Sequence, residues 1–276
     1  MIRCKTVASA LRQRVVTAAL LAAVVLAFLV WVPVSVLVPG IGVFALAGAW
    51  EWSRFAGLEG PVARFGYVLA IGVVMIFTWN ATADLSVLVE FLRATALWWL
   101  LALVWILFGA KRGGSLAAAA CGPLVIVPAA VAMGRLVADQ PQGRGLMFFL
   151  IALIAAADIG AYFGGRRFGR HKLAPAVSPG KTWEGFGSGL VAAGGVALAG
   201  SFLFGARPMP WVSLCVVVAL VSVVGDLSVS MFKRRAGLKD SGSLLPGHGG
   251  VLDRIDSVAA AGPVFLLGLI LLGLPA

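Results

Sequence analysis

Long apolar runs recur along the whole chain and are separated by short polar connections. A helix needs roughly 20 residues to cross a bilayer, and most of the runs approach that length. They lack the two-residue alternation of barrel strands, so helices are expected, because only helices or closed barrels satisfy their backbone in lipid. We predict an all-α, polytopic integral membrane protein with about nine transmembrane helices. The expected spans are residues 15–31, 34–50, 67–79, 94–108, 116–133, 146–163, 186–204, 212–232 and 258–272.

The composition excludes an ordinary soluble domain. The 276 residues are 12% charged and the mean hydropathy is +1.02, whereas soluble domains carry about 25% charged residues. The net charge of +11 raises the question of a nucleic-acid partner, but the basic residues are spread over the loops that flank the spans. Topology and anionic lipid headgroups explain such a distribution. We therefore expect the lipid bilayer as a partner and no nucleic acid.

The basic residues also predict the orientation. With a cytoplasmic N-terminus and nine crossings, eighteen of the Lys and Arg residues lie inside and four lie outside. This distribution matches the positive-inside rule. The chain starts with basic residues as a signal peptide does, but no convincing cleavage site follows, so we expect a retained first helix. The four outside residues are Arg93, Arg135, Arg144 and Arg207.

The distribution of charge divides the chain into two regions. We predict an N-terminal transmembrane bundle at residues 1–140 and a C-terminal catalytic transmembrane region at residues 141–276. The second region carries two long cytoplasmic loops, residues 166–181 and 233–255. Its acidic residues, Asp158 among them, also move to positions beside the membrane. We therefore expect the function to reside in the second region.

Three aspartates of this region are candidates for a metal site. An ionised carboxylate costs roughly 2.5–3.5 kcal/mol at the centre of a membrane helix, and Asp226 lies near the inner end of its span. Ser230 and Lys233 share its helix face, so mutual neutralisation of Asp226 and Lys233 is the simplest alternative. Asp253 and Asp256 share a face where the last span begins, although capping and the helix dipole could explain them. Three carboxylates at a membrane surface suit Mg²⁺.

Complementary charge lies between these acids. Lys233, Arg234 and Lys239 could bind phosphate oxygens, and the glycines around His248 can bring backbone amides close to an anion. His248 could donate to a phosphate, shuttle a proton or make only a structural hydrogen bond. Metal-binding acids beside phosphate-binding cations predict phosphoryl or nucleotidyl transfer.

The other cytoplasmic loop repeats this combination. Ser178, Lys181 and Thr182 lie in a Pro-Gly turn directly before a predicted helix. Helix N-termini bind anions through their unpaired amides, so the turn is a candidate phosphate site. The alternative is a lipid-headgroup anchor made of interfacial basic residues and Trp183.

Residues 230–256 resemble the signature of the phosphatidate cytidylyltransferases, also called CDP-diacylglycerol synthases. That signature reads S-x-x-K-R, four residues, K-D, and then H-G-G-x-x-D-R-x-D. The segment HKLAPAVSPGKTWEG at residues 171–185 also looks like the family, with Gly180 as a departure. The resemblance is strong over residues 145–260. Every fixed position is present, as Ser230, Lys233, Arg234, Lys239, Asp240, His248, Gly249, Gly250, Asp253, Arg254 and Asp256.

The resemblance implies that CTP and phosphatidic acid react, with Mg²⁺, to give CDP-diacylglycerol and pyrophosphate for phospholipid biosynthesis. It also implies a bacterial inner membrane with the active site on the cytoplasmic side, allows a second cation in the same cluster and leaves a homodimer open. The implied metal ligands are Asp226, Asp253 and Asp256, and the implied catalytic residues are Ser230, Lys233, Asp240 and His248. The implied ligands of phosphate and CTP are Ser178, Lys181, Thr182, Arg234, Lys239, Gly249, Gly250 and Arg254.

Other functions remain open at this point. A CTP-dependent polyprenol or dolichol kinase, or a synthase that acts on a different lipid phosphate, would need the same motifs. A cation-coupled transporter would use Asp158 and Asp226 as ion sites, but two long charged loops on one side and the lack of obvious repeats argue against it. An inactive lipid-binding relative is disfavoured by the intact signature.

Overall fold

The computed structural model describes residues 30–109, 113–242 and 249–274. In this part of the chain, eight helices are long and apolar enough to cross a membrane. The prediction of a helical, polytopic membrane protein is therefore confirmed, whereas the count of nine and the orientation stay predictions. The first expected span, residues 15–31, lies almost wholly outside the described residues. The helices are α2 (Val34–Phe55), α3 (Pro61–Ala81), α4 (Leu85–Gly109), α5 (Ser115–Asp139), α6 (Gly143–Phe168), α7 (Trp183–Leu203), α8 (Pro208–Arg235) and α9 (Leu252–Leu272).

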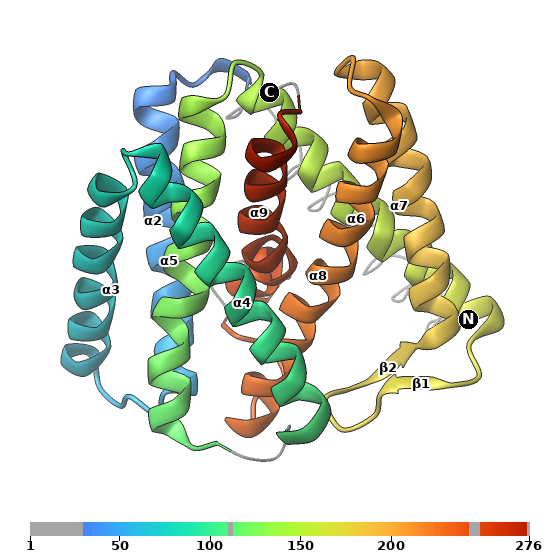
Figure 1. Cartoon of the computed structure of the whole chain (residues 1–276). Helices are drawn as coiled ribbons and strands as arrows, with labels where there is room; N and C mark the ends of the chain where they lie inside the picture. Colours follow the sequence, from blue (N-terminus) through green and yellow to red (C-terminus); the bar gives the residue numbers. More distant parts are fainter. Residues whose placement is uncertain (1–29, 110–112, 243–248, 275–276) are drawn as a thin grey trace, which may run out of the picture.

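Consecutive helices run in opposite directions, so the chain passes back and forth through one bundle (Figure 1). Short connections allow this arrangement, because neighbouring helices can then pack antiparallel. The ends of α6 and α8 and the starts of α7 and α9 point toward the lower end in Figure 1. The two long loops predicted to be cytoplasmic are consequently at the same end of the bundle.

Helix starts explain why the observed elements are longer than the expected spans. Pro61 and Pro208 open α3 and α8, at positions where the missing N–H of proline costs nothing. Thr182 caps α7 with its side chain. The last helix begins at Leu252, earlier than the expected residue 258, so Asp253 belongs to its first turn.

The connection between α6 and α7 differs from the expectation of a simple turn. It folds into an antiparallel hairpin of β1 (Lys172–Ala174) and β2 (Ser178–Thr182), with Lys172 opposite Thr182. The hairpin pairs backbone groups that would otherwise need other partners beside the membrane. It is the one strand pair in the described chain, and it carries Lys181 to the end of the helical bundle.

Helix α9 lies in the middle of the bundle, between α4, α5 and α8 (Figure 1). Phe265 and Leu266 on α9 are fully buried, and they pack in a cluster with Leu92 of α4 and Leu150 of α6. The hydrophobic core is thus continuous across residue 140, and the boundary between the two predicted regions stays a prediction. Helix α3 is peripheral, since Ile71 is its one buried residue.

Small residues allow two helix pairs to approach closely, as is common inside membranes. On α7, a Cβ atom added to Gly189 would lie 2.7 Å from the carbonyl oxygen of Ala157 on α6. On α8, a Cβ atom at Gly225 would overlap the carbonyl oxygen of Asp256 and lie 2.9 Å from the Cβ atom of Ala260 on α9. The absence of a side chain at Gly225 therefore sets the distance between the helices that carry Asp226 and Asp256.

We predict that Gly225→Ala destabilises the protein, because the added methyl group forces α8 and α9 apart. Overpacking of this kind costs about 1–3 kcal/mol. Thermal unfolding of the detergent-solubilised protein should show a lower midpoint. The matched control is Gly195→Ala on α7, where a Cβ atom meets nothing within 4 Å; equal midpoints for the two variants would contradict the prediction.

Candidate functional site

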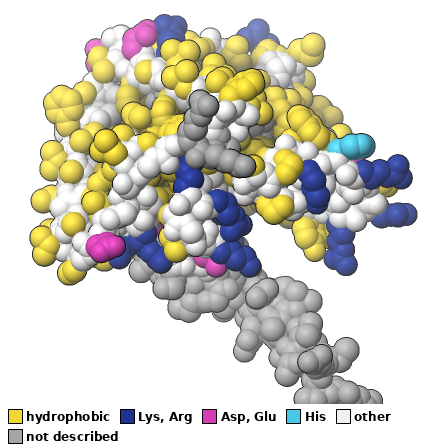
Figure 2. Space-filling model, turned by 90° about the horizontal axis from the view of Figure 1, so that it is seen from below, with side chains coloured by type: hydrophobic (Ala, Val, Ile, Leu, Met, Phe, Trp, Pro, Cys, Tyr) yellow, Lys and Arg dark blue, Asp and Glu magenta, His cyan; other side chains and the backbone are white. Residues whose placement is uncertain are grey.

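The predicted site residues gather where the end of α8, the start of α9 and strand β2 meet. This region lies at the lower end of the bundle in Figure 1, and the view of that end in Figure 2 shows Lys and Arg side chains collected on it. The last turn of α8 alone contributes Lys233, Arg234 and Arg235, whose charges also complement the negative end of the helix dipole. The local charge is therefore strongly positive around a few carboxylates.

The first ion pair joins the hairpin between α6 and α7 to helix α8. Lys181 Nζ on β2 contacts Asp226 Oδ2 on α8. Ser230, one turn further along α8, donates from Oγ to Asp226 Oδ1 at 3.2 Å. Asp226 and Ser230 thus share one helix face, as predicted. Lys181, from a segment distant in the sequence, pairs with Asp226 on that face.

The second ion pair joins α8 to α9. Lys233 Nζ lies 2.6 Å from Asp253 Oδ1, and the two side chains are only 11% and 12% exposed. The alternative that Lys233 neutralises Asp226 on the same helix is therefore wrong, because the Lys233 side chain turns toward α9. Asp253 Oδ2 accepts hydrogen bonds from the backbone N–H groups of Ser241 at 3.0 Å and Gly250 at 3.1 Å, so both of its oxygens are engaged.

Asp256 lies one turn further into α9 and is 9% exposed. Its Oδ1 accepts a hydrogen bond from the backbone N–H of Ser257 at 2.7 Å. It is close enough to Asp226, Asp253 and Lys233 to interact electrostatically with all three. The structure thus brings the three predicted aspartates to one place, and the close contact at Gly225 is what makes this possible.

A metal ion needs several ligand oxygens that converge on one point. Among the described residues, no group of three His, Cys, Asp or Glu side chains is placed to hold one. Two of the three carboxylates face lysine ammonium groups instead. The donor chemistry nevertheless fits Mg²⁺, which prefers carboxylate oxygens and usually takes one or two of them together with water and phosphate oxygens. The three-aspartate metal site stays a prediction.

Thr182 has a structural role at the start of α7. It is buried and its Oγ1 accepts a hydrogen bond from the backbone N–H of Gly185 at 3.1 Å. Glu184 in the first turn of α7 accepts hydrogen bonds from the backbone N–H groups of Arg170 and His171. These contacts fix the hairpin against α7 and thereby direct Lys181 toward Asp226. Ser178 lies at the other end of β2.

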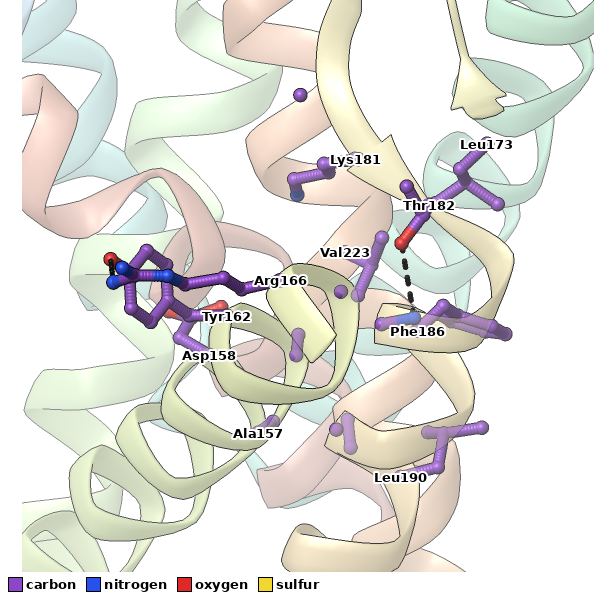
Figure 3. A pocket seen from close by; sticks show the side chains of 16 residues that line it. Ala157, Asp158, Tyr162, Arg166, Leu173, Lys181, Thr182, Phe186, Leu190 and Val223 are labelled. Atoms are coloured by element: carbon purple, nitrogen blue, oxygen red, sulfur yellow. Dashed lines mark hydrogen bonds between the residues drawn. The ribbon is translucent and has the colours of Figure 1, made fainter. Parts of the chain in front are cut away.

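A cavity of about 370 Å³ opens beside the first ion pair, between α6, α7, α8 and the hairpin (Figure 3). Asp158, Tyr162 and Arg166 line it from α6, and Lys181 lines it from β2. Asp158 interacts electrostatically with both Lys181 and Asp226. The remaining lining is mainly apolar and includes Leu190, Val223, Ala157, Phe186 and Ala219. The cavity therefore joins a charged end to an apolar wall.

The remaining predicted residues lie at the edge of the site. Gly249 has φ +80°, and a Cβ atom there would lie 3.1 Å from Asp253 Oδ2, so a side chain would be strained. Gly250 uses its N–H group for Asp253 and so does not offer it to an anion in this conformation. His248 lies outside the described residues. Four predicted residues are exposed: Arg234, Lys239, Asp240 and Arg254.

One residue that the sequence analysis did not select is Glu51 on α2. It is 1% exposed and accepts hydrogen bonds from the backbone N–H groups of Val251 and Leu252 and from Ser241 Oγ. The signal in the sequence was an acid directly after an apolar run, a position at which burial needs compensation. Its partners lie about 200 residues away, so the pairing itself was not readable.

These features define a multi-pass membrane protein with a paired-charge site at one end of its bundle. The chain matches the Cytidylyltransferase family over residues 12–272, and it belongs to that family. It is 40% identical to the phosphatidate cytidylyltransferase of Pseudomonas aeruginosa, over 92% of this chain and 95% of that protein. It is 39% identical to the phosphatidate cytidylyltransferase of Haemophilus influenzae, over 92% of this chain and 97% of that protein. The family resemblance predicted from the signature is confirmed.

We predict that Asp253→Asn lowers the free energy of unfolding by about 1–3 kcal/mol. The asparagine amide would point an N–H group either at Lys233 or at the two backbone N–H donors, and one of these buried groups would lose its acceptor. Denaturant or thermal unfolding in detergent measures the change. Asp240→Asn, at an exposed position in the same segment, is the control; equal stability of the two variants would rule out the proposed role of the Asp253 contacts.

Proposed function

We propose that this chain transfers CMP from CTP to phosphatidate, giving CDP-diacylglycerol and pyrophosphate. The observation that carries the proposal is its similarity, over nearly its whole length, to proteins named phosphatidate cytidylyltransferase. The site supports the same reaction from its chemistry, because cations and carboxylates lie side by side at one end of the bundle. No other set of charges in the described chain combines two lysine–aspartate pairs with a cavity.

The reaction joins two anions. An oxygen of the lipid phosphate attacks the α-phosphorus of CTP, a new P–O bond forms, and the bond to the β-phosphate breaks so that pyrophosphate leaves with the electron pair. The attacking oxygen is already ionised near neutral pH, so no strong general base is required. The enzyme must align the two phosphates and neutralise their charge, which are the main contributions in phosphoryl-type transfer.

The lysines of the two ion pairs are suited to this task. Lys181 and Lys233 are each held beside a carboxylate, which fixes their position before substrate arrives. Arg234 and Lys239 are exposed nearby and can contact the distal phosphates of CTP. Ser230, already bonded to Asp226, can orient a phosphate oxygen. These assignments follow the predicted roles, with Asp240 and His248 retained as candidate catalytic groups of the same segment.

Mg²⁺ is the cofactor that we propose, and Asp226, Asp253 and Asp256 would hold it. When bound it supplies positive charge against the phosphates. The carboxylates repel one another where they meet, and in the described conformation Lys181 and Lys233 compensate part of that repulsion. Within this set, three carboxylates face two lysines, and the remaining negative charge attracts a divalent cation. A second cation is compatible with the same set.

The cavity beside Lys181 is the proposed place for the phosphatidate headgroup. Its volume of about 370 Å³ falls in the range of small-molecule sites, roughly 300–1,000 Å³. Arg166 and Lys181 can bind the lipid phosphate, and the apolar wall at Leu190 and Val223 can contact the glycerol and the first acyl carbons. Phosphate chemistry would then occur at the membrane surface while the acyl chains remain in lipid.

We propose that the site faces the cytoplasm at a bacterial inner membrane, and the basic residues at this end support that orientation through the positive-inside rule. Arg54, Arg166 and Lys233 all belong to this end, whereas Arg93 and Arg207 lie at the opposite end. CTP would therefore reach the site from the cytoplasm. With the predicted first span at residues 15–31, this orientation would leave the N-terminus on the cytoplasmic side.

The proposed reaction is tested with purified protein, labelled CTP and a panel of lipid phosphates in Mg²⁺-containing buffer. We expect phosphatidate to gain CMP with release of one pyrophosphate for each lipid product. A lipid that gains only phosphate would indicate a kinase and overturn the proposal. CMP transfer to a polyprenyl phosphate but not to phosphatidate would overturn the substrate assignment.

We predict that Asp226→Ala and Asp256→Ala each reduce turnover by about 100-fold or more, because each removes charge that the reaction needs in fixed positions. The amount of protein in the membrane should be unchanged. Initial rates of CMP transfer at several Mg²⁺ concentrations measure the effect. Asp139→Ala, at the opposite end of the bundle, is the control, and a wild-type rate in either site variant would refute the metal assignment.

A further inference from the structure

A carboxylate from the N-terminal half of the chain holds the segment that carries the family signature. Glu51 on α2 is 1% exposed. Its Oε1 accepts a hydrogen bond from the backbone N–H of Val251 at 3.0 Å, and its Oε2 accepts one from the N–H of Leu252 at 2.8 Å. Ser241 Oγ donates to the same Oε2 at 2.8 Å. A buried carboxylate with three donors is a specific structural arrangement and not a chance contact.

These donors form what we call the neck, defined as Ser241 together with residues 250–252. Asp253 Oδ2 joins the two sides of the neck by accepting from the N–H groups of Ser241 and Gly250. Glu51 joins the same two sides again through Ser241 Oγ and the N–H groups of residues 251 and 252. Two carboxylates, one on α2 and one on α9, therefore clasp the neck together.

Glu51 also supplies the cap that α9 lacks. The N-cap residue Val251 has no side-chain cap hydrogen bond, and the first N–H groups of any helix have no partner within the helix. The Glu51 oxygens accept from these groups at the positive end of the helix dipole, where negative charge is stabilising. The cap thus comes from another helix and sets how the first turn of α9 is oriented.

Asp253 and Asp256 lie on α9 within five residues of its start, so the orientation of the first turn determines where both carboxylates lie. Arg54, on the same helix as Glu51, adds a second link by donating from Nη1 to the carbonyl oxygen of Ser241 at 3.3 Å. Glycine is required beside Glu51, because a Cβ atom at Gly250 would lie 2.7 Å from the Glu51 carboxyl carbon. Helix α2 is therefore joined to the neck and to the start of α9 by hydrogen bonds and by close packing.

We infer that Glu51 is a positioning residue for CMP transfer: by clasping the neck it holds Asp253 and Asp256 in register with Asp226 and Lys233. The inference rests on the proposed function and assigns a specific task to the N-terminal half of the chain. It requires a carboxylate, since a glutamine would turn an N–H group toward a backbone N–H or toward the Ser241 hydroxyl. The buried donor at that point would lose its acceptor.

The test compares Glu51→Gln with Glu59→Gln, which makes the same change at an exposed position four residues beyond the end of α2. We expect kcat for CMP transfer to fall about 10- to 100-fold in Glu51→Gln, as for other residues that orient a reacting set, while KM for CTP stays within about threefold. Glu59→Gln should match the wild type. Hydrogen exchange at the amides of Val251 and Leu252 should be faster in Glu51→Gln only.

A second, smaller substitution keeps the test valid if Glu51→Gln fails to fold. Ser241→Ala removes one of the three donors to Glu51 and should lower kcat about 3- to 10-fold with KM again preserved, consistent with one lost hydrogen bond. Wild-type kcat in folded Glu51→Gln protein would overturn the inference. The inference would also be overturned if, in both variants, activity fell only in proportion to the amount of folded protein.

The two proposals fail in different ways. If the wild-type protein transfers no CMP to phosphatidate, the proposed function fails, but faster amide exchange in Glu51→Gln still measures the neck contact. If the wild type is active and the exchange of Val251 and Leu252 is unchanged in the variant, the inference about Glu51 fails and the proposed function stands.

Discussion

Buried carboxylates must be compensated, and that constraint organises this protein. An ionised group inside an apolar bundle is stable only where cations or N–H donors meet it. Asp226 meets Lys181, and Asp253 meets Lys233 and two backbone N–H groups. Glu51 meets two N–H groups at the start of α9 and the hydroxyl of Ser241. Each compensation joins segments that are distant in the chain. The charges that suit the site to phosphate chemistry are consequently also the contacts that hold its elements together.

Helix packing brings these charges into range. The glycines at the α6–α7 and α8–α9 contacts allow the backbones to approach, as small residues do in membrane bundles. The first contact forms the wall of the cavity, and the second brings Asp226 close to Asp256. In the proposed reaction, the paired lysines would exchange a carboxylate for a phosphate oxygen without moving far. This gives a physical reason for ion pairs in a site that must bind two anions.

The sequence predicted most of the helices because apolar runs of bilayer length leave few alternatives. It predicted Asp226 and Ser230 on one face, which the hydrogen bond between them confirms. The alternative that Asp226 and Lys233 neutralise each other is wrong, since they pair with Lys181 and Asp253. The sequence gave no sign of the β1–β2 hairpin. Local spacing places side chains on a helix face but does not say which neighbouring helix that face meets. The role of Glu51 was missed for the same reason.

The sequence by itself determined the membrane class, the approximate position of the eight described spans and the family, because hydropathy and the 230–256 signature are written in consecutive residues. The tertiary structure decided which lysine faces which aspartate, where the cavity lies and that α2 caps α9. These features depend on contacts between residues up to 201 positions apart. Such contacts are selected by the packing of whole helices, which the periodicity of one segment does not encode.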